Sequence, residues 1–251
     1  MQLTGRKSIG VGNPGRFSTT GTTRRKQLVT RNAWDRVNAG DDSEVSRSTH
    51  KSRTKEVTMS AGNSSKALKI LGIAGSLRRA SYNRAALQAA RELLPEGAEL
   101  DIFDLDGIPV FNQDDENQPP ARVTELKNRV RAADAILFAT PEYNYSIPGV
   151  LKNAIDWASR PYGDSAWTGK PVAVMGASVG TLGTARAQYH LRQVFVFLNM
   201  PALNQPEVMI ANATEHFDAN GKLLDEKARS LIQQLLEGLV AWTRQLQKNP
   251  A

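Results

Sequence analysis

From Lys66 to the end of the chain, short apolar or β-branched runs alternate with longer segments whose apolar residues recur at helical spacing. Such runs are typical of strands buried on both faces, and the longer segments are typical of helices that pack on a sheet. The alternation predicts strand–helix–strand units around a mostly parallel sheet, which is an α/β fold. Strands are expected over residues 68–74, 98–103, 135–140 and 171–177, with a less regular one near 202–210.

Helices are expected over residues 83–94, 121–132, 149–159, 184–199 and 225–246. The last of these carries Leu231, Leu235, Leu239 and Trp242 at spacings of four, four and three. This spacing puts the four side chains on one face, which should pack on the sheet. Residues 66–251 are therefore predicted to form a flavodoxin-like three-layer sandwich with a five-stranded parallel sheet, and such sheets bind ligands beyond the carboxyl ends of the strands.

The first 58 residues differ in composition from the rest of the chain. They contain 12 Lys and Arg against 5 Asp and Glu, so they carry the whole net charge of +7 and the remainder is neutral. They are rich in Ser, Thr, Gly and Arg and show little hydrophobic periodicity. Too little apolar surface is available to offset the entropy of ordering, which predicts a disordered basic extension over residues 1–58.

Three interpretations of this extension stay open. The favoured one takes Met59 as the true initiator, since it stands shortly before the first strand. The second is organellar targeting, because residues 1–34 are rich in Arg and Ser and contain no acid, although they show no clear amphipathic face. The third is a basic arm for nucleic acid, but only Phe17 and Trp34 could stack on bases, so nucleic acid is not expected as a partner. A cytoplasmic location is predicted.

Composition excludes several kinds of chemistry. The chain has no cysteine, which rules out disulfides, thiolate nucleophiles, Cys-ligated zinc and protein-bound iron–sulfur clusters. His50, His190 and His216 lie far apart and form no metal-binding spacing, so no metal site is predicted. No apolar stretch is long enough to cross a bilayer, so no membrane partner is expected. Redox chemistry would therefore require a bound cofactor.

The stretch LGIAGSLRRASYN, residues 71–83, joins the first strand to the first helix. Ser76, Ser81 and Asn83 supply small hydrogen-bonding groups at a helix N-terminus, and Arg78 adds a forked positive charge. The loop matches neither GxGxxG nor GxxxxGK[ST], which favours a monoester phosphate over a dinucleotide. A helix capped by Ser81 with solvated arginines remains the alternative.

Two further loops should open on the same edge of the sheet. In TPEYNYSIPG, residues 140–149, prolines on both sides of Tyr143 and Asn144 favour a fixed turn that suits a flat heteroaromatic ring. In GASVGTLG, residues 176–183, Ser178 supplies a hydroxyl and glycines such as Gly180 allow close approach to a ligand. Alone, each could be a plain surface connection. Together with the first loop they predict one pocket, at the place where flavodoxin-like sheets bind FMN.

At these motifs the sequence resembles the NADPH-dependent FMN reductase family, and within it the branch of quinone and chromate reductases. The resemblance covers nearly all of residues 67–247. It implies that the first loop binds the FMN phosphate and that the segment PEYNYSIPGVLKNAIDW contacts the isoalloxazine ring. The phosphate residues it implies are Ser76, Arg78, Ser81, Tyr82 and Asn83, and the ring residues are Pro141, Glu142, Tyr143 and Asn144.

The resemblance also implies an activity. A hydride from NADPH or NADH would pass through FMN to a small-molecule electron acceptor, such as a quinone, chromate, an azo or nitro compound or free flavin, by a ping-pong mechanism. No catalytic side chain is required, because the cofactor does the chemistry. Self-association as a dimer or tetramer is expected, and Arg186, His190 and Arg192 on the fourth helix are expected at an interface or in solvent. A flavodoxin-type electron carrier without its own NAD(P)H reaction is the alternative.

Overall fold

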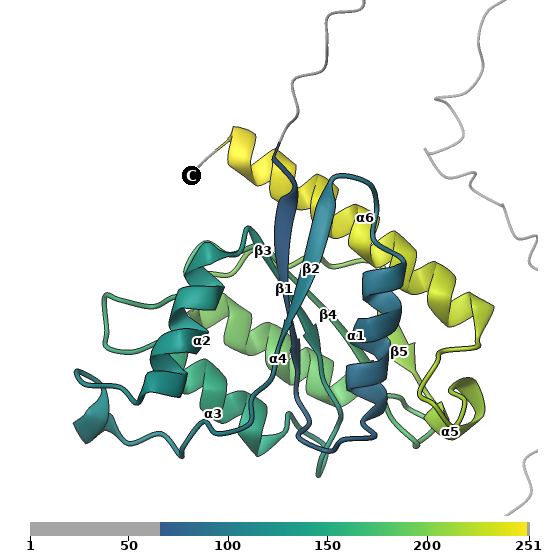
Figure 1. The fold of residues 1–251 in the computed structure, drawn as a ribbon, viewed down its shortest axis with the longest axis horizontal. Helices are drawn as coiled ribbons and strands as arrows, with labels where there is room; N and C mark the ends of the chain where they lie inside the picture. Colours follow the sequence, from purple (N-terminus) through teal and green to yellow (C-terminus); the bar gives the residue numbers. More distant parts are fainter. Residues whose placement is uncertain (1–65, 250–251) are drawn as a thin grey trace, which may run out of the picture. The chain divides into compact units, whose positions relative to one another are not determined.

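The structure is a computed structural model that describes residues 66–249 (Figure 1). The extension predicted over residues 1–58 lies outside the described residues. The strands are β1 (Leu68–Ala74), β2 (Ala98–Phe103), β3 (Ala135–Ala139), β4 (Val172–Ala177) and β5 (Val208–Ile210). The helices are α1 (Tyr82–Glu92), α2 (Ala121–Ala132), α3 (Gly149–Ala158), α4 (Ala185–Phe197), α5 (Ala213–His216) and α6 (Glu226–Lys248), with a 3-10 turn η2 (Gln113–Asp115).

The five strands form one parallel sheet in the order β2-β1-β3-β4-β5. β1 pairs on both sides, so that Ile70 lies opposite Leu100 of β2 and Ala135 of β3. Every residue of β3 and β4 is buried, which explains why these strands read as continuous apolar runs. This strand order is that of flavodoxin, and the predicted fold class is confirmed.

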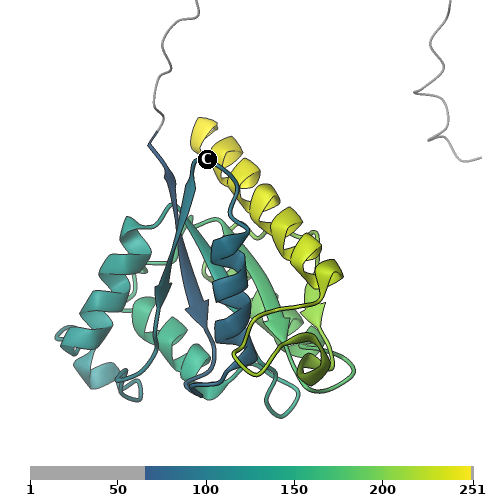
Figure 2. The same ribbon diagram turned by 45° about the vertical axis from the view of Figure 1, so that its right-hand side comes forward.

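Helices cover both faces of the sheet, as Figures 1 and 2 show. α1 and α6 lie on one face, where Leu87 and Ile232 are completely buried. α2, α3 and α4 lie on the other, where the ring of Phe138 packs at 5.8 Å from that of Trp167 and at 5.6 Å from that of Phe195, measured between centroids. The two apolar cores fix the positions of the strands. The loops at the strand ends lie outside these cores and are available to bind ligands.

The structure shortens some predicted elements and adds two. The fifth strand is limited to Val208–Ile210, because the chain through Pro206 is irregular and Ala202 makes only one isolated bridge, to Val172. η2 and α5 were not predicted, since segments of three and four residues are too short to show a period. Most other predicted boundaries agree to within one or two residues.

The apolar stripe predicted on the last helix is present on α6. Leu235 and Leu239 are buried against the sheet, while Leu231 and Trp242 are half-buried at the edges of the stripe. The Trp242 indole N–H donates to the Pro201 carbonyl at 3.1 Å, which ties α6 to the segment before β5. Among the described residues, no helix combines the length and apolarity needed to cross a bilayer.

Gly176 provides a test of how closely β4 approaches its neighbours. A Cβ at this position would lie 2.4 Å from the Thr140 carbonyl oxygen and 2.0 Å from the Thr184 hydroxyl oxygen. We therefore expect Gly176→Ala to lower the free energy of unfolding by about 3 kcal/mol, because buried backbone cannot move aside. Urea unfolding of the full chain measures the change.

Gly149→Ala is the matched control for this substitution. Gly149 is the first residue of α3, and nothing lies within 4 Å of a Cβ built there. Alanine favours a helix over glycine, so this variant should gain about 0.5 kcal/mol or stay unchanged. Equal urea midpoints for Gly176→Ala and the wild type would contradict the close packing at the end of β4.

Candidate functional site

Three loops meet at the carboxyl edge of the sheet, after β1, β3 and β4. The Gly75 amide donates to the Ala139 carbonyl at 2.9 Å, and the Ser76 and Tyr143 hydroxyl oxygens lie 3.5 Å apart across the first two loops. The loops surround a cavity of about 500 Å³, which we call the carboxyl-edge cavity and which has the size of a small-molecule site. It is lined by Ser76, Arg78, Ser81, Tyr82, Asn83, Pro141, Glu142, Tyr143, Ala177, Ser178 and Val179.

Nine of the eleven residues predicted to bind the cofactor line this cavity. The other two, Asn144 and Gly180, belong to the same loops but are not part of the lining. Ala177 and Val179 line it without having been named from the sequence, because small apolar residues carry no chemical signal of a site. The structure thus brings the predicted set together, and the contact of each residue with a ligand stays a prediction.

Two of the predicted phosphate residues hold the start of α1 in place. The Ser81 hydroxyl oxygen accepts from the amides of Asn83 at 3.2 Å and Arg84 at 3.4 Å, so the helix-cap interpretation of Ser81 is confirmed. The Asn83 side chain forms two hydrogen bonds with the backbone of Ala177, donating to its oxygen at 2.8 Å and accepting from its nitrogen at 2.9 Å. Both side chains are buried, and together they join the first loop to the end of β4.

The rest of the first loop presents donors. Arg78 is exposed, and its guanidinium carbon lies 5.3 Å from the centroid of the Tyr82 ring. Within residues 66–249, the backbone N–H groups of Leu77 and Tyr82 have no hydrogen-bond acceptor. The first turn of α1 carries no acidic side chain. A helix N-terminus with free N–H groups beside a guanidinium is a site for an anion.

Arg84 supports this loop and was missed in the sequence. Its Nε donates to the Ser76 carbonyl at 3.2 Å, and its guanidinium pairs with Asp104, just after β2. The pair is part-exposed, so its contribution to stability is small. It nevertheless fixes the orientation of the Ser76 peptide. Asp104 follows a strand outside the three loops, so only the pairing of β1 with β2 reveals the contact.

The second loop contains a tight reverse turn. The Tyr143 amide donates to the Ser146 carbonyl and the Ser146 amide donates to the Tyr143 carbonyl, both at 3.0 Å. Asn144 and Tyr145, between them, have φ values of 49° and 66°. Positive φ at both central residues is the pattern of a type I′ turn. The turn leaves the Tyr143 side chain half exposed at the carboxyl-edge cavity.

Glu142 connects this turn to the N-terminus of α4. Its carboxylate accepts from the amides of Arg186 at 3.0 Å and Ala187 at 3.2 Å and pairs with the Arg186 guanidinium. The carboxylate side chain is only 5% exposed. Burial raises the pKa of Glu142, but hydrogen bonds and the charge of Arg186 lower it more, and the net pKa is below its usual value. Glu142 is therefore ionised at neutral pH.

The third loop closes the cavity from the side of β4. The Ser178 hydroxyl oxygen accepts from the Gly180 amide at 3.2 Å, and the Ser178 amide donates to the Ile210 carbonyl at 2.9 Å. Gly180 accepts through its carbonyl from the amides of Gly183 and Asn212. These backbone contacts shape the loop, and the close approach of Gly180 to a ligand stays a prediction.

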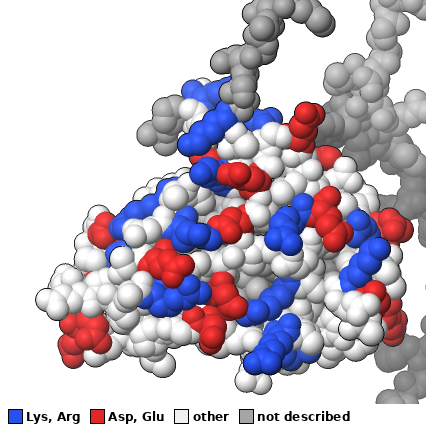
Figure 3. Space-filling model, in the orientation of Figure 1, with Lys and Arg blue, Asp and Glu red and all other residues white. Residues whose placement is uncertain are grey.

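Basic and acidic side chains are mixed on one face of the domain (Figure 3). On the face seen in Figure 3, basic and acidic side chains are interspersed and neither sign forms a continuous patch. This agrees with the balance of charges after residue 58. No group of three or more His, Asp or Glu side chains that could hold a metal ion occurs in the part of the chain that the structure describes.

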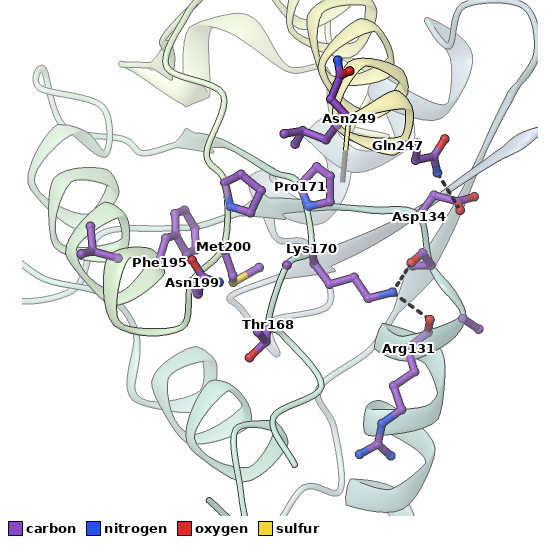
Figure 4. Close-up of a pocket in the computed structure, with 16 residues that line it drawn as sticks. Arg131, Asp134, Thr168, Lys170, Pro171, Phe195, Asn199, Met200, Gln247 and Asn249 are labelled. Atoms are coloured by element: carbon purple, nitrogen blue, oxygen red, sulfur yellow. Dashed lines mark hydrogen bonds between the residues drawn. The ribbon is translucent and has the colours of Figure 1, made fainter. Parts of the chain in front are cut away.

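A larger cavity, of about 820 Å³, lies at the opposite, amino edge of the sheet (Figure 4). It contains none of the predicted site residues. The Lys170 ammonium lies in it, donating to the carbonyls of Arg131 at 2.8 Å and Ala133 at 2.6 Å at the C-terminus of α2, and burial lowers the pKa of Lys170. The Lys170 ammonium is therefore already engaged in capping the C-terminus of α2. Because parallel sheets bind ligands at the carboxyl edge, the smaller cavity is the candidate site.

The fold and this cavity define a class of protein: a flavodoxin-like domain with a mononucleotide-sized site at the carboxyl edge of its sheet. Comparison with known sequences narrows the class. Residues 68–215 match the family model described as NADPH-dependent FMN reductase. The chain belongs to this family, as its resemblance in sequence implied. It is an NAD(P)H-dependent FMN reductase, and the predicted use of FMN and NAD(P)H is confirmed.

Individual relatives agree with the family assignment. The chain is 59% identical over 181 residues to an NAD(P)H-dependent FMN reductase of Pseudomonas aeruginosa, covering 71% of this chain and 97% of that protein. It is 45% identical over 178 residues to a 2-hydroxy-1,4-benzoquinone reductase of a Burkholderia species, covering 71% and 97%. Among solved structures, FerB, a flavoenzyme NAD(P)H:(acceptor) oxidoreductase of Paracoccus denitrificans, matches with a TM-score of 0.66 and 36% identity over 71% of this chain and 98% of that one.

Proposed function

We propose that this chain reduces quinones with NAD(P)H through FMN bound in the carboxyl-edge cavity. The observation that carries the proposal is the composition of the cavity wall, in which anion-binding donors of the first loop stand beside the exposed ring of Tyr143 from the second. Similarity to a benzoquinone reductase supports the choice of acceptor. The same wall would suit no metal-dependent chemistry, because it contains no histidine and a single carboxylate, which pairs with Arg186.

The donor set fits FMN at both ends. At the phosphate end, the free amides of Leu77 and Tyr82 and the guanidinium of Arg78 would bind the dianion, and Ser76 would add a hydroxyl. Ser81 and Asn83 would shape the loop through the hydrogen bonds that they already make, and each would still have a proton to donate to the phosphate. At the ring end, Pro141 and Tyr143 would pack on the isoalloxazine, while Asn144 would act through the turn.

FMN supplies the redox chemistry, because its ring accepts a hydride from NAD(P)H and passes two electrons to an acceptor. Overall, NAD(P)H loses a hydride to become NAD(P)⁺, and the quinone gains that electron pair and two protons, one of them from water, to become the hydroquinone. The side chains that line the cavity need only bind and orient. One open site would receive the two substrates in turn, which favours ping-pong kinetics and a broad choice of acceptors, including chromate, azo and nitro compounds and free flavin.

Arg78 tests the phosphate end of the site. Arg78→Ala should weaken FMN binding by about 2 kcal/mol, close to thirtyfold in Kd, because a charge-assisted contact is lost. Quenching of FMN fluorescence on titration with the cofactor-free full chain measures Kd. Arg79→Ala is the matched control, since Arg79 is the next residue and does not line the cavity. An unchanged Kd for Arg78→Ala would contradict the proposal that the first loop binds the FMN phosphate.

The reaction itself is tested without oxygen. Adding NADPH to the FMN-loaded full chain should bleach the flavin absorption, and adding a benzoquinone should restore it. Initial rates at several fixed quinone concentrations should give parallel double-reciprocal lines. Intersecting lines would overturn the ping-pong mechanism. A flavin that stays oxidised with NADPH would favour the electron carrier and contradict the proposed reaction.

We also propose that α4 mediates the predicted self-association. Val196 and Phe197 at its end are 81% and 76% exposed, next to a groove of about 620 Å³ formed with Ile147 and Gly149. Exposed apolar side chains beside a groove are typical of an interface. We propose that a second copy of this chain occupies the groove.

The predicted cytoplasmic location agrees with the proposed function, because NAD(P)H is supplied within cells.

Phe197→Glu tests this interface. Burying an unpaired carboxylate at the interface would cost desolvation free energy, so the variant should sediment as a monomer where the wild type is expected to sediment as a dimer or tetramer. Leu224→Glu is the control, because Leu224 is 53% exposed but lies outside that groove. A monomeric wild type, or an oligomer that survives Phe197→Glu, would refute the role of α4.

A further inference from the structure

The turn at Tyr143 is held in a conformation that its own residues disfavour. Type I′ turns require positive φ at both central positions, which asparagine tolerates and glycine prefers. Asn144 fits this rule, but the second position is Tyr145, at φ 66°. A left-handed conformation is unfavourable for a residue with a Cβ, because the Cβ comes too close to the following carbonyl oxygen. Something outside the turn must compensate, because strained backbone persists only where its surroundings hold it.

A cation–π contact, an ion pair and several hydrogen bonds to α4 hold this turn. The Arg186 guanidinium carbon lies 3.6 Å from the centroid of the Tyr145 ring, and the same guanidinium pairs with Glu142. The Glu142 carboxylate also accepts the two amides at the start of α4. On the far side, the Ser146 hydroxyl hydrogen-bonds with Nδ1 of His190 at 2.9 Å. The Tyr143–Ser146 turn is thus held on α4 by Glu142, which precedes it, and by its own last two residues.

Glu142 is the centre of this arrangement. It is the one residue of the second loop that contacts both the N-terminus of α4 and the arginine that covers Tyr145. Its carboxylate is 5% exposed, whereas the Arg186 side chain is 34% exposed and can be solvated without it. Removing the charge of Glu142 should therefore release Arg186 to solvent and withdraw the support of the strained turn.

We propose that Glu142 is a positioning residue, which fixes the Tyr143–Ser146 turn on α4 so that the Tyr143 ring stays at the carboxyl-edge cavity. It acts through the turn and not by contact of its carboxylate with the cofactor. The inference rests on the proposed function, since it assigns the turn to the ring end of the FMN site.

Glu142→Gln tests the inference with little change in shape. Glutamine can still accept one amide of α4 but has no charge for Arg186. We expect FMN to bind about tenfold more weakly to this variant, equal to about 1.4 kcal/mol, and the visible circular dichroism of bound FMN to change. The thermal midpoint of the cofactor-free protein should fall only slightly, because the sheet and its cores are untouched.

A second substitution distinguishes positioning from contact. Tyr145→Gly creates Asn-Gly, the preferred pair for a type I′ turn, and removes the strain that the contacts with α4 offset. We therefore expect FMN affinity to recover to within about threefold of the wild type in the double variant that combines Glu142→Gln with Tyr145→Gly. Glycine adopts positive φ readily, so the turn no longer needs the support of Glu142. A direct ligand contact of Glu142 would not be rescued in this way.

Glu125→Gln is the matched control. It too removes a carboxylate from an arginine, Arg122, at 2.6 Å, but on α2 and away from the cavity. It should leave FMN binding unchanged. Wild-type affinity in Glu142→Gln, or weak binding that Tyr145→Gly fails to restore, would overturn the inference.

Hydrogen exchange of the cofactor-free protein separates the inference from the proposed function. The Tyr143 amide donates to the Ser146 carbonyl, and the Ser146 amide donates to the Tyr143 carbonyl. The exchange rates of these two amides therefore report the stability of the turn directly. Their exchange should be faster in Glu142→Gln than in the wild type and in Glu125→Gln. If the wild type binds no FMN, the proposed function fails whatever the exchange shows. If FMN binds but exchange is unchanged, the positioning role alone is wrong.

Discussion

The parallel direction of β1, β3 and β4 is the constraint on which the site depends. Because all three strands end at the same edge, three loops that are far apart in the sequence meet around one cavity. Gly75 allows the approach of the first two loops: a Cβ there would lie 3.1 Å from Pro141 and from Leu151. The two hydrogen bonds between Asn83 and Ala177 bring in the third. The cavity is thus a product of strand order and close backbone contact.

The two ends of the cavity differ in whether their charged groups are free to meet a ligand. The first loop leaves amides and a guanidinium free, where an anion can pair with them. The second loop uses its only carboxylate internally, on the N-terminus of α4, where the helix dipole favours a negative charge. As a result the wall presents positive and neutral groups to a ligand, although a glutamate is part of it. An ionised carboxylate facing the same space would repel a phosphate.

Most of the fold follows from the sequence, because the spacing of apolar residues shows a clear period in the long helices and strands. The first two strands and α2 were predicted with their observed bounds, and the stripe on α6 identified its buried face. Agreement was worst for β5, where only three residues pair and Pro206 interrupts the approach. Short elements are decided by what they pack against, and a pattern of three or four residues carries no period.

The residue types at the candidate site were also determined by the sequence: the set predicted to bind a phosphate after the first strand, a proline-bounded turn after the third and a glycine-containing loop after the fourth. Tertiary structure decided their tasks. Ser81 and Asn83 form hydrogen bonds that join the loops, Arg84 pairs with Asp104, and the Glu142 carboxylate pairs with Arg186. A sequence shows which hydrogen-bonding groups a loop owns. Which of them remain free is set by partners that are distant in the chain, and only the folded sheet brings those partners within reach.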